Sequence, residues 1–195
     1  MMSMTAPSAR PRRRADAERS IARIVSAART LLSSDPNAST DDIARAAGVG
    51  RMTLYGHFRT RADLVEAALT DALRDGEAVL AAVDLSGDPR AAIGRLLASS
   101  WELVAESGAL LAAAEDVLPA GRVRELHDPP ARRMADLVRR GRDEGVMRTD
   151  LPEAWLVGAV HYLVHGAATE VRAGRLAAED APDAVTKSVL SVLTG

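Results

Sequence analysis

The chain has 195 residues, of which 47% are hydrophobic and 27% are charged, a composition typical of a globular protein. It contains no cysteine, which excludes disulfides, thiolate metal sites and cysteine nucleophiles. No apolar run approaches the roughly 18 residues that a membrane span needs, and the opening residues lack the apolar core of a secretory signal. We therefore expect a cytoplasmic protein.

The charges are unevenly divided along the chain, although the net charge is only -2. Residues 1–61 carry eleven arginines and five acidic residues, whereas residues 62–195 carry fourteen basic and twenty-two acidic residues. Because neutralising phosphates requires local positive charge, this division indicates a polyanion-binding head joined to an acidic body. An arginine-rich surface without a partner would have the same composition, so charge alone leaves both interpretations open.

The head is predicted to be helical after a basic arm. Residues 1–14 are expected to be disordered, and the arginines at 10, 12, 13 and 14 fit either an arm in a minor groove or a plain tail. A first helix follows, because apolar residues recur at helical spacing until residues 34–37 end it. The apolar residues of this helix are Ile21, Ile24, Val25, Ala28, Leu31 and Leu32. Ser39 and Asp42 then form a capping pair for a short helix that begins near Thr40.

The body is also predicted to be helical, since no stretch shows sustained period-2 alternation. Thr60 and Asp63 cap a long helix that continues to about Val83. Asp88 with Pro89 starts the next helix, which ends near Glu106.

Four further helices are expected after it. Residues 109–114 are assigned to a short separate helix, and another starts at residue 128 and stops at Gly145. Asp150, as cap, and Pro152 start a helix over residues 151–173, and the last helix covers 181–194. The expected fold is all-α with about nine helices, divided into a head over 15–62 and a body over 63–195.

Residues 42–58 have the pattern of a helix-turn-helix. Two helices that cross steeply need a small residue at their contact, a glycine in the turn and an apolar residue after it, and Ala44, Gly48 and Val49 meet these needs. Four apolar residues, Ile43, Ala47, Leu54 and Phe58, can then pack inward. The second helix therefore presents its other face, with Arg51, Met52, Thr53 and Tyr55, to a DNA major groove.

The same residues resemble the TetR family of transcriptional regulators. The resemblance is carried by Ile43-Ala44, Ala47-Gly48-Val49, Thr53-Leu54-Tyr55 and His57-Phe58, followed by Thr60 and a basic residue. It implies that Tyr55 and Arg61 grip phosphates, that Arg51, Met52 and Thr53 face bases, and that Thr40 and His57 belong to the same surface. Gly56 departs from the bulkier residue common in the family.

The resemblance also implies a homodimer formed by the last two helices and a small-molecule cavity in the body. The expected domains are therefore a helix-turn-helix DNA-binding domain over 15–62 and an effector-binding and dimerisation domain over 63–195. Val189, Val192 and Leu193 are expected to supply apolar area to the dimer. The expected partners are double-stranded operator DNA, a second copy of the chain and an unidentified effector, and the expected function is a repressor that the effector releases from a palindromic operator.

Six body residues are candidates for the cavity wall, since aromatic residues make up only 3% of the chain and several lie in the body. They are Trp101, Met134, Trp155, His161, Tyr162 and His165. His161 and His165 are one helical turn apart and could share a metal, but no carboxylate completes a metalloenzyme pattern. We therefore expect core or pocket histidines and no metal or cofactor.

Two other functional classes remain in view. A helical interaction or scaffold protein with a basic head would explain the charge, but not a glycine-centred turn followed by Arg51, Thr53 and Tyr55 on one exposed face. An enzyme is not expected, because the chain has no recognisable nucleophile, phosphate loop or metal cluster.

Overall fold

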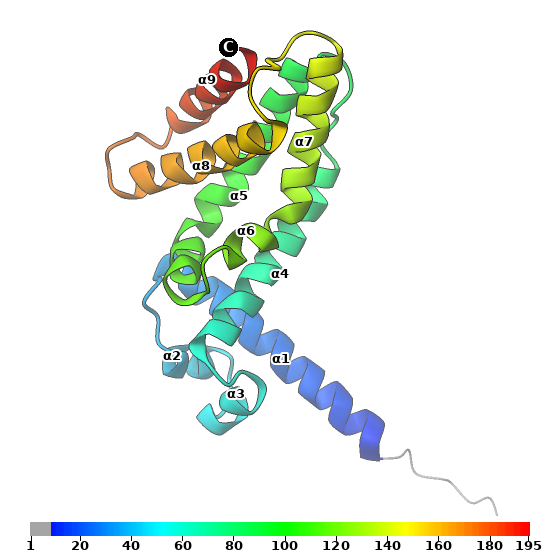
Figure 1. The fold of residues 1–195 in the computed structure, drawn as a ribbon. Coiled ribbons are helices and arrows are strands. Elements are labelled where there is room, and N and C mark those ends of the chain that lie inside the picture. Colours follow the sequence, from blue (N-terminus) through cyan, green and yellow to red (C-terminus); the bar gives the residue numbers. More distant parts are fainter. Residues whose placement is uncertain (1–8) are drawn as a thin grey trace, which may run out of the picture.

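The computed structural model describes residues 9–195, with side chains from Arg14 onward, and this part of the chain folds into helices without strands (Figure 1). The helices are α1 (Ala9–Ser34), α2 (Thr40–Ala46), α3 (Arg51–His57), α4 (Arg61–Ala81), α5 (Pro89–Val117), α6 (Arg122–Leu126), α7 (Asp128–Asp143), α8 (Glu153–Arg172) and α9 (Ala181–Thr194). The all-α prediction is confirmed. Residues 1–8 of the predicted arm lie outside the described residues, and residues 9–14, predicted to be disordered, are the first turns of α1.

The helix ends in the head follow the predicted capping residues. The Ser39 side chain accepts a hydrogen bond from the Asp42 backbone N–H and starts α2. Thr60 and Asp63 form a complete capping box at the start of α4, each side chain bonded to the other residue's backbone N–H. These local bonds fix where the chain leaves one helix and enters the next.

Two clusters of buried side chains hold the molecule together. The head cluster joins α1, α2, α3 and the first half of α4, and it also takes in Leu110, Ala113 and Ala114 from the end of α5. The body cluster joins the second half of α4 and the first half of α5 to α7, α8 and α9. α4 and α5 therefore belong to both cores, and the domain division at residue 62 stays a prediction.

Three features of the body differ from the sequence prediction. α5 continues through Ser107 and Gly108 to Val117 instead of ending near Glu106, so the separate helix over 109–114 does not exist. The five-residue α6 was not predicted. Asp150 is not a cap, because Pro152 occupies that position and the Asp150 carboxylate is bound by the Arg148 guanidinium at 2.7 and 2.8 Å.

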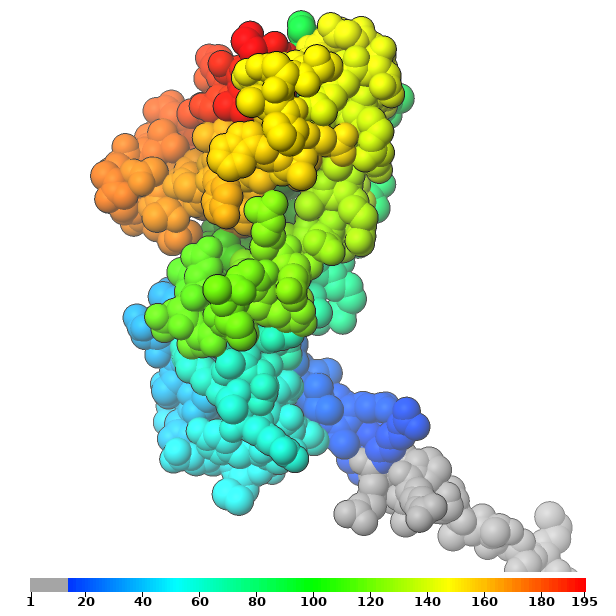
Figure 2. Space-filling view, viewed as in Figure 1, coloured from blue at the N-terminus to red at the C-terminus, as the bar shows by residue number. Residues whose placement is uncertain are grey.

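The molecule is elongated, with α2 and α3 at one end and α7, α8 and α9 at the other (Figure 1). The space-filling view places the surface of α2 and α3 at the tip of the head, apart from the body (Figure 2). None of the helices over residues 9–195 is long and apolar enough to cross a membrane.

Candidate DNA-binding surface and body cavity

The turn between α2 and α3 has the geometry that the sequence requires. Gly48 has a φ of 63°, in the left-handed region that favours glycine, and the Val49 N–H donates to the Ala44 carbonyl at 3.0 Å. Leu54 is 1% exposed and Phe58 is 9% exposed within the head cluster. The buried side of α3 is therefore fixed, and its orientation relative to the head is determined.

The opposite side of α3 is open to solvent. Arg51, Met52 and Thr53, all predicted to face bases, are exposed, and the Met52 side chain is 84% exposed. An exposed arginine, methionine and threonine in the first turn of such a helix can hydrogen-bond base edges and contact thymine methyl groups.

Tyr55 is held in place by its neighbours on α2 and α3. Its hydroxyl lies 3.1 Å from the Thr40 hydroxyl, and the Arg51 guanidinium lies over its ring, 5.6 Å from the ring centre. The hydrogen bond with Thr40, followed by that with Arg51, lowers the pKa of Tyr55 below its ordinary value. Arg51 also forms an ion pair with Asp41 at 3.1 Å. Thr40 and Tyr55 thus form one polar edge beside the exposed face of α3.

Arg61 and His57 lie outside the first turn of α3. The Arg61 guanidinium donates to the carbonyl oxygens of Ala38 at 2.5 Å and Pro36 at 2.7 Å. In this structure Arg61 therefore holds the segment before α2 against the start of α4. His57 is half-buried at the end of α3.

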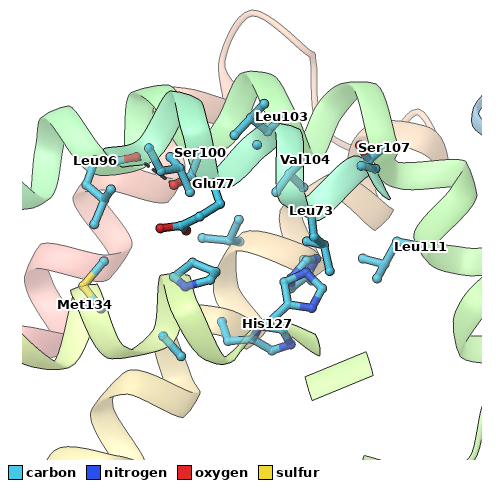
Figure 3. A pocket seen from close by; sticks show the side chains of 18 of the residues that line it. Leu73, Glu77, Leu96, Ser100, Leu103, Val104, Ser107, Leu111, His127 and Met134 are labelled. Atoms are coloured by element: carbon cyan, nitrogen blue, oxygen red, sulfur yellow. Dashed lines mark hydrogen bonds between the residues drawn. The ribbon is translucent and has the colours of Figure 1, made fainter. Parts of the chain in front are cut away.

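The body contains a cavity of about 170 Å³ between α4, α5, α7 and α8. Its wall is mostly aliphatic, and Figure 3 shows the side chains of α4 and α5 on one side facing His127 and Met134 on the other. The polar wall residues include Glu77, which forms an ion pair with Arg133 of α7, and Ser100, whose hydroxyl donates to the Leu96 carbonyl at 2.8 Å.

Three histidines gather at one side of this cavity. The ring centres of His161 and His165 are 4.2 Å apart, and the ring of His127 lies 5.4 Å from the first and 5.2 Å from the second. Burial is the main cause that lowers the pKa of His161 to about 4 and that of His165 to about 3, and burial also lowers the pKa of His127. All three rings are therefore neutral near pH 7. Within residues 9–195, no group of histidines and carboxylates is arranged to hold a metal ion.

The six predicted wall residues divide into two sets of three. Met134, His161 and His165 line the cavity. Trp101 does not, because it is packed in the body core at 7% exposure, and Trp155 and Tyr162 are 63% and 67% exposed on the outer face of α8. Helical periodicity places a residue on a face but does not say whether that face meets a core, a cavity or solvent.

Several wall residues escaped the sequence analysis. His127 lies in the turn between α6 and α7, where no helical periodicity applies. Leu73, Gly76 and Glu77 lie on the long helix α4, to which the sequence analysis assigned no wall residue. In the sequence, His127 two residues before Pro129 carried no signal of a cavity.

The head and body together define a helix-turn-helix DNA-binding protein with a cavity-bearing helical body. Residues 24–68 match the model of the bacterial regulatory proteins of the tetR family. No curated protein matches the chain. The helix-turn-helix head is thus similar to the TetR family, and the fold of the whole chain is similar to that of TetR-family regulators of known structure.

Solved TetR-family structures share the fold over nearly the whole chain. The TetR-like regulator LfrR from Mycobacterium smegmatis, in complex with proflavine, is 24% identical with a TM-score of 0.68, covering 90% of this chain and 96% of its own. A TetR-family regulator from Agrobacterium tumefaciens is 23% identical with a TM-score of 0.69, covering 92% and 100%. The ketosteroid regulator KstR2 of Mycobacterium tuberculosis is 19% identical with a TM-score of 0.65, covering 90% and 95%.

Proposed function

We propose that the chain is a homodimeric repressor that binds a palindromic operator and is released from it by a small molecule in the body cavity. One observation carries the DNA-binding part. α3 is fixed on one side by the buried Leu54 and Phe58, while Arg51, Met52 and Thr53 are exposed together on the other. A helix held in this way enters a major groove with its first turn against the base edges.

The phosphate contacts are assigned to the polar edge beside α3. Thr40 is the first residue of α2, and Tyr55 presents its hydroxyl next to it. Hydroxyl groups and backbone N–H groups at helix starts are common phosphate ligands, and they position the reading helix without reading sequence. Arg61 supports this edge through its bonds to Pro36 and Ala38, and His57 lies at the far end of α3.

The dimer is assigned to the outer face of α8, together with α9. Trp155, Ala159, Tyr162 and Gly166 follow one another at spacings of four, three and four residues and form one stripe, on which the two aromatic residues are largely exposed. Val189 and Leu193, expected at the interface, are instead 0% exposed inside the single chain. The apolar area for a partner must therefore come mainly from α8, with the two aromatic residues as anchors.

Ligand release is supported by the position of the cavity. α4 forms part of the cavity wall and part of the head core, so a ligand that changes its position also moves the helix-turn-helix. In LfrR, a TetR-like regulator of the same fold, the bound compound is proflavine. A coupling of about 1 to 3 kcal/mol between the two sites would change operator affinity about 5- to 150-fold.

Selection of binding sequences from a random duplex pool tests the proposal. The expected result is an inverted repeat whose half-sites lie one helical turn apart or a multiple of it, because a two-fold dimer presents two α3 helices. Enriched sequences without an inverted repeat would contradict binding as a two-fold dimer. The absence of any enriched sequence would contradict sequence-specific binding.

A further inference from the structure

The three histidines make one polar corner in an otherwise aliphatic cavity. His161 and His165 come from α8, one turn apart, and His127 reaches them from the turn before α7. Leucines of α4 and α5, among them Leu73, Leu103 and Leu111, line other parts of the wall. Any molecule in the cavity thus meets hydrocarbon on most of its surface and imidazole at one point.

The hydrogen bonds of these rings leave acceptors available. Nδ1 of His127 lies 2.7 Å from the carbonyl oxygen of Val123, and because a carbonyl can only accept, Nδ1 carries the proton. In the neutral ring, Nε2 is then an acceptor. Nδ1 of His165 is buried and has no partner within the described part of the chain. A buried polar atom without a hydrogen bond is costly, so an occupant that bonds to it is favoured.

The charges on the wall argue against an ionic occupant. Among residues 9–195, Arg29 is the only arginine or lysine that lines the cavity, and it is engaged by Asp71 and Asp75 of α4. Of the two carboxylates in the lining, Glu77 is engaged by Arg133, and Glu106 is exposed to solvent. The charges of Arg124 and Arg172 act on His161 and His165, but neither arginine lines the cavity. Among residues 9–195, the lining therefore offers an anion no unpaired cation, and a buried cation would lose its hydration beside a Glu77 carboxylate that is already paired.

The volume limits the size of the occupant. An engineered apolar cavity of about 150 Å³ is large enough to bind benzene. The cavity in this chain is of similar size, about 170 Å³. A single ring with small substituents fits without displacement of the walls.

We infer that the cavity takes an uncharged, single-ring phenol or a similar ring alcohol, whose hydroxyl donates to an imidazole nitrogen of the His127, His161 and His165 cluster. The ring lies among the leucines of α4 and α5. A phenol of this kind is the effector class for the body cavity. The inference rests on the proposed function only where it takes the bound phenol to change DNA binding.

Four one-ring probes, measured on the full-length protein without DNA at pH 7, test the inference. Phenol offers a hydroxyl, toluene no polar group, benzoate a negative charge and benzylamine a positive charge. Phenol is expected to bind about tenfold more tightly than toluene, the effect of one good buried hydrogen bond, and more tightly than either ion. Equal binding of phenol and toluene, or tighter binding of benzoate or benzylamine, overturns the inference.

Variants then locate the hydroxyl. His127→Phe and His165→Phe should reduce the preference for phenol over toluene, while toluene still binds. If the larger apolar rings prevent folding, the variants His127→Gln and His165→Gln are used instead. Ser99→Ala is the matched control, because Ser99 also lies on α5 but does not line the cavity. A phenol preference that survives at both histidine positions would place the hydroxyl elsewhere and overturn the assignment.

Operator binding is measured separately, so that the two proposals can fail independently. Phenol that binds at the histidines without weakening the operator complex leaves the ligand class intact and contradicts release. An ion or a purely apolar compound that releases DNA while phenol does not bind supports release and overturns the ligand class.

Discussion

The histidine cluster should make the stability of the protein fall as the solution becomes mildly acidic. Burial lowers the pKa of His161 to about 4 and that of His165 to about 3, from an ordinary value of 6.5. The unfolded chain therefore takes up protons between pH 6.5 and 4 that the native chain does not. Stability is unaffected by these groups above pH 6.5 and is lost progressively as the pH falls through this window.

The size of the effect follows from linkage. A histidine that stays neutral in the native chain costs up to about 1.4 kcal/mol for each pH unit below its unfolded pKa. Two such rings, two pH units below 6.5, give at most about 5.6 kcal/mol, and their partial exposure reduces this to about 2 to 3 kcal/mol. Arg124 and Arg172 face the rings of His161 and His165 and act in the same direction. Glu115 acts on His127 in the opposite direction, but less than burial does.

The double variant His161→Gln and His165→Gln removes both titrations and keeps polar side chains in the same places. Urea unfolding at pH 6.5 and pH 4.5, followed by far-ultraviolet circular dichroism, measures the loss of stability across the window for each protein. The loss should be smaller in the variant by about 2 to 3 kcal/mol. An equal loss in both proteins would show that the rings titrate in the native state and that the cluster is solvated.

The other predictions concern the head, the dimer and the link between them. Arg51→Ala should cost about 1 to 3 kcal/mol on the operator and relax preference at one base pair per half-site; equal losses on random DNA would contradict its base-reading role. Arg61→Met should weaken binding to all DNA sequences and lower the melting temperature of the protein, because it frees the segment before α2. Weaker DNA binding at an unchanged melting temperature would favour a direct phosphate contact. Trp155→Glu should give folded monomers by sedimentation, and an unchanged dimer would exclude this face. Arg122→Gln and Glu66→Gln each remove the 2.6 Å ion pair between α6 and α4. In an operator-binding titration, the double variant should lose no more of the ligand's effect on operator affinity than either single variant. Additive losses would show that the two residues do not act as a pair.

The sequence predicted most of the fold because its helix boundaries are local. Ser39, Thr60 and Asp88 cap the helices that they were expected to cap, and Gly145, with a φ of 70°, follows the end of α7 as predicted. Each of these signals depends on residues within one turn. The surface of α3 was predictable for the same reason, since its buried and exposed residues alternate with helical periodicity.

The remaining errors come from contacts between distant segments. A helix end was expected near Glu106, but α5 continues through the buried Gly108, which lies beside the Arg172 side chain of α8. Trp155 and Tyr162 could not be assigned to solvent or cavity from their spacing, and His127 joins the other histidines only through the turn that carries it. The cavity is a property of tertiary structure.

Any effect of a ligand on DNA binding is expected to involve α4, and the packing of this helix explains why. Leu64, Val65 and Ala68 anchor its first half in the head, whereas its second half forms cavity wall and approaches α5 closely enough that a Cβ on Gly76 would lie 3.2 Å from Leu103. Two tightly packed contacts on one helix do not deform continuously, so α4 moves as a body or not at all. A ligand shifts this equilibrium only by the difference between its affinities for the two positions of α4. A compound that fills the histidine corner without touching α4 should therefore bind without releasing DNA, and one that spans from the histidines to Gly76 should do both.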